Sequence, residues 1–254
     1  MTVNQKEVTV SGITASNKYY DGNTTATLIT TAATFTDIVT GDNLTISATG
    51  TFDNKNAGTG KTVTLSNLTL GGTDAGNYLL ATSGNQATTT ADINPKEVTL
   101  NWDTTSSWVY DSNSHQPTAT VGGLVSGDDC TVSTYDLTAA SGSSLTTDGK
   151  AVDVGSYTVE AKALSNSNYK LPTEASKDFT ITAASATLSI GNVTKTYGDA
   201  AFTPTATTPS SGTITYTSGN PDVITIGSDG KLNIVAANTA PVTITANQAA
   251  AGNY

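Results

Sequence analysis

Short runs in which hydrophobic and polar residues alternate are the main pattern along this 254-residue chain. In Asn43–Phe52 every second residue from Leu44 is apolar or small, with threonine or serine between them. Ser156–Ala163 alternates in the same way, and Lys177–Thr182 and Pro241–Ala246 are shorter examples. A period of two predicts strands with one buried face. No segment has sustained helical periodicity, so we expect an all-β chain.

The runs recur about every 8–15 residues and are separated by turns rich in Gly, Asn, Asp and Ser. This spacing favours antiparallel β-sandwiches over a parallel sheet covered by helices. We therefore predict three tandem immunoglobulin-like antiparallel β-sandwich domains, with β-grasp-like units as the alternative.

Four motifs recur in the same order along the chain, which indicates internal repeats. The paired tyrosines Tyr20 and Tyr78, Tyr110 and Tyr169, and Tyr197 and Tyr254 lie 58, 59 and 57 residues apart. The motifs themselves are KEVTV/KEVTL (Lys6–Val10, Lys96–Leu100), YYDGN/VYDSN/TYGDA (Tyr19–Asn23, Val109–Asn113, Thr196–Ala200), VTGDN/VSGDD (Val39–Asn43, Val125–Asp129) and the three NY endings.

These matches place domains at 1–93, 94–183 and 184–254, which we call the first, second and third repeats. The connections between them are short, so we expect little freedom between neighbours. A strand-like segment follows the NY motif in the first and second repeats, but none follows Tyr254. We therefore expect a truncated third repeat that lacks its closing strand, either because the sequence is a fragment or because another chain supplies that strand.

Composition narrows the classes of partner. The chain has 51 threonines, a net charge of −10 and no arginine. Threonine favours pleated, half-exposed strands. Arginine is the preferred side chain for phosphates and base edges, so we expect no nucleic-acid partner. No apolar run reaches 18 residues, so we expect no membrane insertion in this fragment.

Residues that carry chemistry are scarce. His115 and Cys130 are the only histidine and cysteine, so an ordinary zinc site cannot form. We expect His115 in a surface loop and Cys130 as a buried thiol in phase with Val132. No nucleophile, phosphate-binding or dinucleotide motif occurs, so we expect no catalysis and no cofactor. Calcium at the acidic turns around Asp42 and Asp128 stays open as an alternative.

Four aromatic residues at the start of the second repeat form the candidate binding patch: Trp102, Trp108, Tyr110 and His115. A flat aromatic platform could stack a sugar ring or contact a partner chain. The alternative is that one tryptophan fills the core and the other packs at the junction with the first repeat. Loss of binding without unfolding in Trp102→Ala and Trp108→Ala would discriminate between the two.

The motifs resemble known families. KYYDGNTTATL, VTGDNLTI and DAGNY in the first repeat are similar to the YDG domain of large bacterial surface proteins. VYDSNSHQPTATVGGL in the second repeat resembles an MBG-type domain. The third repeat also resembles MBG domains, and Ser218–Thr245 resembles bacterial immunoglobulin-like group 2 modules, although Asn238–Ala240 replaces the glycine of the late turn. The resemblance implies surface-exposed immunoglobulin-like modules without catalysis, and it carries no site residues.

Three functions follow as hypotheses. The first is a non-catalytic structural spacer or stalk in a bacterial cell-surface or secreted adhesin-like protein. The second is an adhesive module that binds an extracellular host glycan or protein. The third is a set of accessory domains of a secreted polysaccharide-active enzyme. In each case we expect an extracellular location and a monomer.

Overall fold

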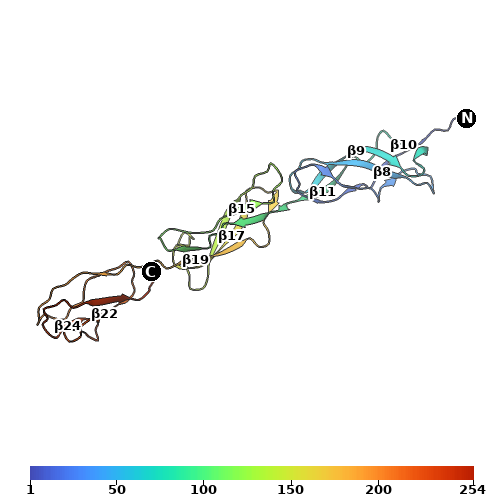
Figure 1. The fold of residues 1–254 in the computed structure, drawn as a ribbon. Helices are drawn as coiled ribbons and strands as arrows, with labels where there is room; N and C mark the ends of the chain where they lie inside the picture. The colour runs from blue at the N-terminus through green and yellow to red at the C-terminus, as the bar shows by residue number, and fades with distance from the viewer. The chain divides into compact units, whose positions relative to one another are not determined.

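Strands account for all of the regular structure apart from one short 3-10 turn. The computed structural model describes residues 1–254 (Figure 1), and its single helical element is η1 (Ala75–Asn77). The all-β prediction is confirmed. No helix in the structure is long and apolar enough to cross a membrane.

The first repeat is built around a five-stranded sheet with the order β4-β11-β9-β8-β5. Its centre is the long antiparallel pair β8 and β9, and β11 lies antiparallel to the other side of β9. Smaller pairs β1-β10, β2-β7 and β3-β6 complete the repeat. The strands are β1 (Lys6–Val8), β2 (Val10–Ser11), β3 (Thr14–Ala15), β4 (Lys18–Tyr19), β5 (Thr25–Ala26), β6 (Leu28–Ile29), β7 (Thr34–Phe35), β8 (Thr45–Phe52), β9 (Gly58–Gly71), β10 (Tyr78–Leu80) and β11 (Thr88–Asn94).

The second and third repeats use shorter strands. In the second repeat β13 pairs with β15, β12 with β18, and β19 with both β14 and β17. In the third, the antiparallel pairs are β20-β21, β22-β25 and β23-β24. The strands are β12 (Lys96–Glu97), β13 (Thr99–Trp102), β14 (Ser107–Val109), β15 (Ala119–Gly122), β16 (Val132–Ala139), β17 (Gly155–Leu164), β18 (Tyr169–Lys170), β19 (Ser176–Thr182), β20 (Ser189–Ile190), β21 (Ala206–Thr207), β22 (Ile214–Ser218), β23 (Ile224–Ile226), β24 (Leu232–Ile234) and β25 (Ile244–Gln248).

The chain divides into two compact units whose boundaries pass through the second repeat. Unit 1 is Met1–Trp102, Ala119–Tyr135 and Ala161–Ala175. Unit 2 is Asp103–Thr118, Asp136–Glu160 and Ser176–Tyr254. Unit 1 therefore holds the first repeat and the part of the second that follows it directly in space. Unit 2 holds the rest of the second repeat and the third.

Four strand pairs are parallel, which a purely antiparallel sandwich does not contain. They are β1-β10, β4-β11, β12-β18 and β14-β19. Each joins a strand near the start of a repeat to one near its end, with a large part of the repeat lying between them in sequence. Parallel neighbours need such a long crossover connection. The first strands, β1 and β12, thus pair with the strands that begin at the NY tyrosines, β10 and β18, and the closing strands, β11 and β19, pair with β4 and β14.

The predicted alternation matches the burial of most strands. In β8, Ile46 and Phe52 are buried while the threonines between them are exposed. Tyr157 and Val159 in β17 and Phe179 in β19 are likewise buried, as the sequence predicts. The segment 241–246 is different, because its apolar residues are only half-buried.

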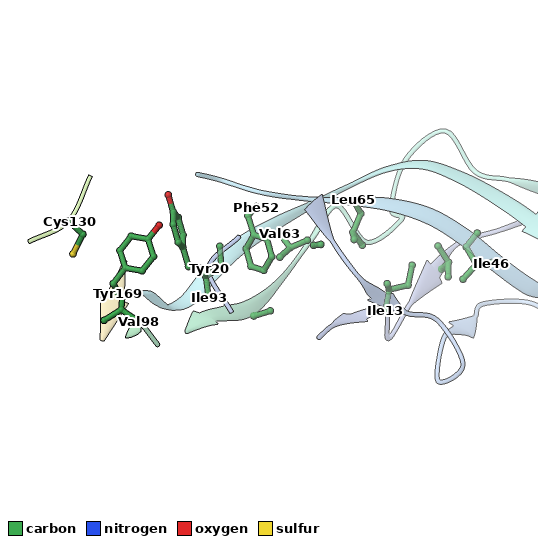
Figure 2. Close-up of a cluster of buried hydrophobic side chains, with 13 residues drawn as sticks. Ile13, Tyr20, Ile46, Phe52, Val63, Leu65, Ile93, Val98, Cys130 and Tyr169 are labelled. Atoms are coloured by element: carbon green, nitrogen blue, oxygen red, sulfur yellow. The ribbon is translucent and has the colours of Figure 1, made fainter. Parts of the chain in front are cut away.

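The core of unit 1 continues from the first repeat into the second (Figure 2). Phe52, Val63 and Ile93 form its centre in the first repeat. Tyr20 and Tyr169 lie side by side at the end of this row, with Val98 and Cys130 beyond them. Burial of apolar surface contributes about 25 cal/mol per Å². This hydrophobic stabilisation therefore acts between the two repeats as well as within each.

An aromatic cluster forms the core of unit 2. The rings of Tyr157 and Phe179 stack with centroids 5.4 Å apart. Trp108 meets Phe179 edge to face at 5.7 Å. Such aromatic pairs add to the stabilisation that burial alone supplies.

Candidate functional site

The tyrosine of the first NY motif is fixed to the VTGD turn within the first repeat. The hydroxyl of Tyr78 donates to Oδ2 of Asp42 at 2.6 Å and accepts from the backbone N–H of Val39 at 2.9 Å. Tyr78 also starts β10, where it lies opposite Lys6 of β1 in parallel register. Three of the four recurring motifs, KEVTV, VTGDN and NY, therefore meet at one end of the repeat, which we call the acceptor end.

The second repeat reproduces this arrangement atom for atom. The hydroxyl of Tyr169 donates to Oδ2 of Asp128 at 2.7 Å and accepts from the N–H of Val125 at 2.9 Å. Tyr169 lies opposite Lys96 in the parallel pair β12-β18. The duplicated sequence motifs thus encode a duplicated set of contacts.

A tyrosine of the first repeat joins the acceptor end of the second. The hydroxyl of Tyr20 donates to the same Oδ2 of Asp128 at 2.7 Å. Its ring meets the ring of Tyr169 edge to face, with centroids 5.5 Å apart and planes at 80°. Tyr20 is 2% exposed, so its ring is buried and its hydroxyl needs this acceptor. One carboxylate oxygen therefore holds a tyrosine from each repeat.

Local turn chemistry positions Tyr20. Lys18 ties the turn that follows it, because its ammonium lies 2.7 Å from Asp21 and donates to Asn23. Gly22 has a φ angle of +81°, a backbone conformation that residues other than glycine rarely adopt. A Cβ on Gly22 would lie 2.7 Å from Cγ1 of Val125, so the turn also packs directly on the second repeat. The Tyr-Asp-Gly turn and residues 56–57, which directly precede β9, form what we call the donor end of the repeat.

An asparagine supplies the second polar link between the first two repeats. Oδ1 of Asn168 accepts from the backbone N–H of Ala57 at 2.8 Å, and its Nδ2 donates to Oδ1 of Asn56 at 3.3 Å. Within the second repeat, the N–H of Lys96 donates to the carbonyl of Asn168 at 2.9 Å and so fixes the backbone of this asparagine. The Asn-Tyr pair of the NY motif therefore uses both of its side chains at this junction.

Unit 2 contains a second junction of the same design. The rings of Tyr110 and Tyr254 meet edge to face at 5.6 Å and 78°. Oδ1 of Asn253 accepts from the N–H of Val154 at 2.8 Å, and its Nδ2 donates to Asp153 at 2.9 Å. The N–H of Ala184 donates to the carbonyl of Asn253, as that of Lys96 does to Asn168.

The two junctions differ in one respect. The third repeat has no VxGD motif, since PSSGT occupies the corresponding stretch, and no carboxylate bridges Tyr110 and Tyr254. The first junction combines ring packing, the asparagine bonds and a shared carboxylate. The second has the ring packing and the asparagine bonds.

The hydrogen bonds to the shared carboxylate change the pKa values of the groups at the first junction. Burial, followed by the hydrogen bond to Asp128, raises the pKa of Tyr169 to about 12. The same two causes raise the pKa of Tyr20. In return, the hydrogen bonds from Tyr169 and Tyr20 lower the pKa of Asp128. The bridge therefore consists of two neutral phenols and one carboxylate at neutral pH.

The predicted aromatic patch is divided between the two units. Trp102 is half-buried in unit 1, where its ring is tilted against Tyr135 at 5.9 Å. In unit 2, Trp108 stacks on His115 at 5.3 Å, and Nε2 of His115 lies 2.8 Å from Asp111. The patch as a binding site stays a prediction. Both tryptophans and Tyr110 take part in packing with aromatic neighbours of the same chain.

Other candidate chemistry falls in separate places. Cys130 is buried, as predicted, although it precedes β16 and does not lie within it. No group of three or more His, Cys, Asp or Glu side chains is placed to hold a metal ion. The third repeat contains an open cleft of about 910 Å³ lined by apolar residues such as Phe202, Ile224 and Ile234 and by polar ones such as Asn192, Thr194 and Lys195. The cleft has no cluster of ionisable groups.

Comparison with known families agrees with the repeat motifs. Residues 4–90 match the model of the YDG domain, and residues 98–180 match that of the MBG domain (YGX type). No curated protein matches the chain. YDG and MBG domains are of a non-catalytic type and are found in surface and secreted proteins.

Proposed function

Because the chain carries a YDG domain followed in tandem by an MBG-type domain, we propose that it is a non-catalytic spacer of a bacterial cell-surface or secreted adhesin-like protein. In such a protein the repeats would hold another domain at a fixed distance from its anchor. The proposal includes an extracellular location, a monomeric chain and no cofactor.

The observation that carries the proposal is the duplicated junction. A spacer has to transmit position from one domain to the next, which needs specific contacts between neighbours. Tyr20, Asp128 and Tyr169 supply such contacts at the first junction, and the edge-to-face ring contact recurs between Tyr110 and Tyr254 at the second, without the shared carboxylate. Flexibly tethered domains would not need buried tyrosines that reach across to a neighbour.

Small-angle X-ray scattering tests the proposal. A single compact body of this length has a radius of gyration of about 18 Å. If the protein is a spacer, we expect a radius of gyration clearly above this value. It should be unchanged by calcium and independent of protein concentration. Tyr19→Ala should leave the curve unchanged, since Tyr19 is 65% exposed, whereas Tyr20→Ala should broaden the distance distribution. A value near 18 Å for the unaltered chain would contradict the spacer role.

An adhesive role is the second candidate, and it rests on the exposed aromatic side chains Tyr19 and Tyr197 in addition to the predicted patch. It predicts saturable binding to an extracellular glycan or protein on a glycan or receptor array. Loss of that binding in Tyr197→Ala or Trp102→Ala, with the chain still folded, would favour adhesion. A spacer with no adhesive function would give no saturable signal for any variant.

A further inference from the structure

The acceptor end of the first repeat has the same design as that of the second but has no neighbour on it. In the second repeat, Asp128 accepts from two tyrosines and Asn168 bonds to two groups of the first repeat. In the first repeat, the equivalent Asp42 accepts from Tyr78 but has no second tyrosine. The equivalent Asn77 is exposed, and its carboxamide has no hydrogen-bond partner.

Apolar side chains that are covered at the occupied junction have exposed counterparts on the first repeat. Val39 is 52% exposed, whereas its counterpart Val125 packs against Gly22 of the first repeat. Val3 is 81% exposed, whereas its counterpart Ile93 is 1% exposed in the core of unit 1. The first repeat thus carries counterparts of the groups at the occupied junction: Val3, Val39 and Asn77 are exposed, and Asp42 accepts from one tyrosine where Asp128 accepts from two.

We propose that this acceptor end, formed by Val3, Val39, Asp42 and Asn77, is a docking surface for the donor end of another YDG domain. The partner must supply a tyrosine hydroxyl for Asp42, a glycine turn that fits over Val39, and a backbone N–H for Asn77. Tyr20, Gly22 and Ala57 provide this set in the existing junction. The inference rests on the contacts of the first junction and holds whether the protein acts as a spacer or an adhesin.

The ring of Tyr78 is already buried without a partner, being 3% exposed. Docking would therefore add little contact area on that ring. The gain is expected at Val39, Asp42 and Asn77, which makes position 39 the most sensitive reporter. Leu79 is a matched control, because it is 50% exposed and its counterpart Lys170 also stays exposed in the occupied junction.

A fused chain tests the proposal. Residues 1–91 are placed ahead of Thr2 of the complete chain, so that Val3 takes the place that Ile93 has in the existing junction. Val39→Cys and Leu79→Cys are introduced separately into the complete chain and into its fused form. Alkylation by iodoacetamide is measured by mass spectrometry at both positions. We expect the thiol at position 39 to react at least tenfold more slowly in the fusion and the thiol at position 79 to react equally in both.

A further pair of variants shows whether the protection has the proposed origin. Gly22→Val in the added copy alone should restore the reactivity at position 39, because its side chain would clash where Val39 should pack. Equal reactivity at position 39 in the fused and unfused chains would overturn the proposal. Protection in the unfused chain that rises with protein concentration and disappears in Tyr197→Ala would also overturn it, by showing a second copy bound through its third repeat. Equal reactivity at position 39 would leave the scattering of the unmodified chain unchanged, whereas a bound second copy would make that scattering depend on protein concentration. Neither result requires a radius of gyration of about 18 Å, the result that contradicts the spacer proposal, so the two failures are distinguishable.

Discussion

Removal of one hydroxyl, in Tyr20→Phe, should weaken the first junction without changing the fold of either repeat. The ring stays in place against Tyr169, so the packing is kept. The lost atom donates to Asp128, which belongs to the other repeat. The variant therefore removes a single contact between repeats.

The size of the effect follows from the surroundings of that hydroxyl. A hydrogen bond to a charged group contributes about 1.5–3 kcal/mol to stability. The Asp128 side chain is 13% exposed and keeps its bond to Tyr169, so water can replace part of the lost interaction. We therefore expect a loss of about 1–2 kcal/mol. With a urea m-value of about 2 kcal/mol/M, the unfolding midpoint should fall by roughly 0.5–1 M.

Urea unfolding followed by tryptophan fluorescence provides the assay, with Trp102 as a reporter inside unit 1. The matched control is Tyr19→Phe, which removes the same atom from the neighbouring residue. Tyr19 is exposed and its hydroxyl makes no hydrogen bond, so we expect a change within about 0.5 kcal/mol.

A double-mutant cycle completes the test. Tyr20→Phe combined with Asp128→Asn should destabilise the chain by less than the sum of the two single effects, because both remove the same bond. Equal midpoints for Tyr20→Phe and Tyr19→Phe, or strict additivity in the cycle, would refute the assignment of this bond as a link between the repeats.

Three further predictions concern the core, the alkaline limit of stability and the buried thiol. Phe179→Ala should lower the free energy of unfolding, measured by thermal unfolding, by about 3–5 kcal/mol, because it removes the centre of the unit 2 aromatic cluster. Val109→Ala, at an exposed site, should leave the free energy of unfolding nearly unchanged. Because the pKa of Tyr169 is raised from 10.0 to about 12, the unfolded chain loses this proton first as the pH rises, so urea midpoints should fall between pH 10 and 12 and fall less in Tyr169→Phe. Because Cys130 is buried in the core of unit 1, its thiol should react with Ellman's reagent only when unit 1 opens, and the rate of this reaction should rise in Tyr20→Ala. Rapid reaction in the unaltered chain would show that the thiol is accessible and contradict the prediction.

The local structure of the chain could be predicted well because alternation and turn chemistry are local properties. The β8 pattern identifies Ile46 and Phe52 as buried, and the structure agrees. The recurrence of the NY motif marks Tyr78 and Tyr169 as equivalent positions, and in the structure each is fixed to the aspartate of its own repeat. The parallel pairing of β1 with β10 was not predicted, because nothing in a three-residue strand specifies a distant partner.

The role of the junction was beyond sequence reasoning for a different reason. Tyr20 and Asp128 are 108 residues apart and belong to different repeats, so no spacing rule connects them. One signal was available: Tyr20 and Tyr78 recur as Tyr110 and Tyr169 at nearly the same separation. Equal spacing is compatible with pins inside each repeat and with contacts between repeats. Only the three-dimensional arrangement distinguishes the two.

Amide hydrogen exchange at Ala57 and Val154 is the most direct measurement of the central claim, that repeats are joined by specific side-chain contacts. Each N–H donates to an asparagine of the following repeat, Asn168 or Asn253. We predict that both amides are protected in the unaltered chain and that Asn168→Ala releases Ala57 while Val154 and the β8-β9 ladder keep their protection. Rapid exchange at Ala57 and Val154 in the unaltered chain would contradict the claim.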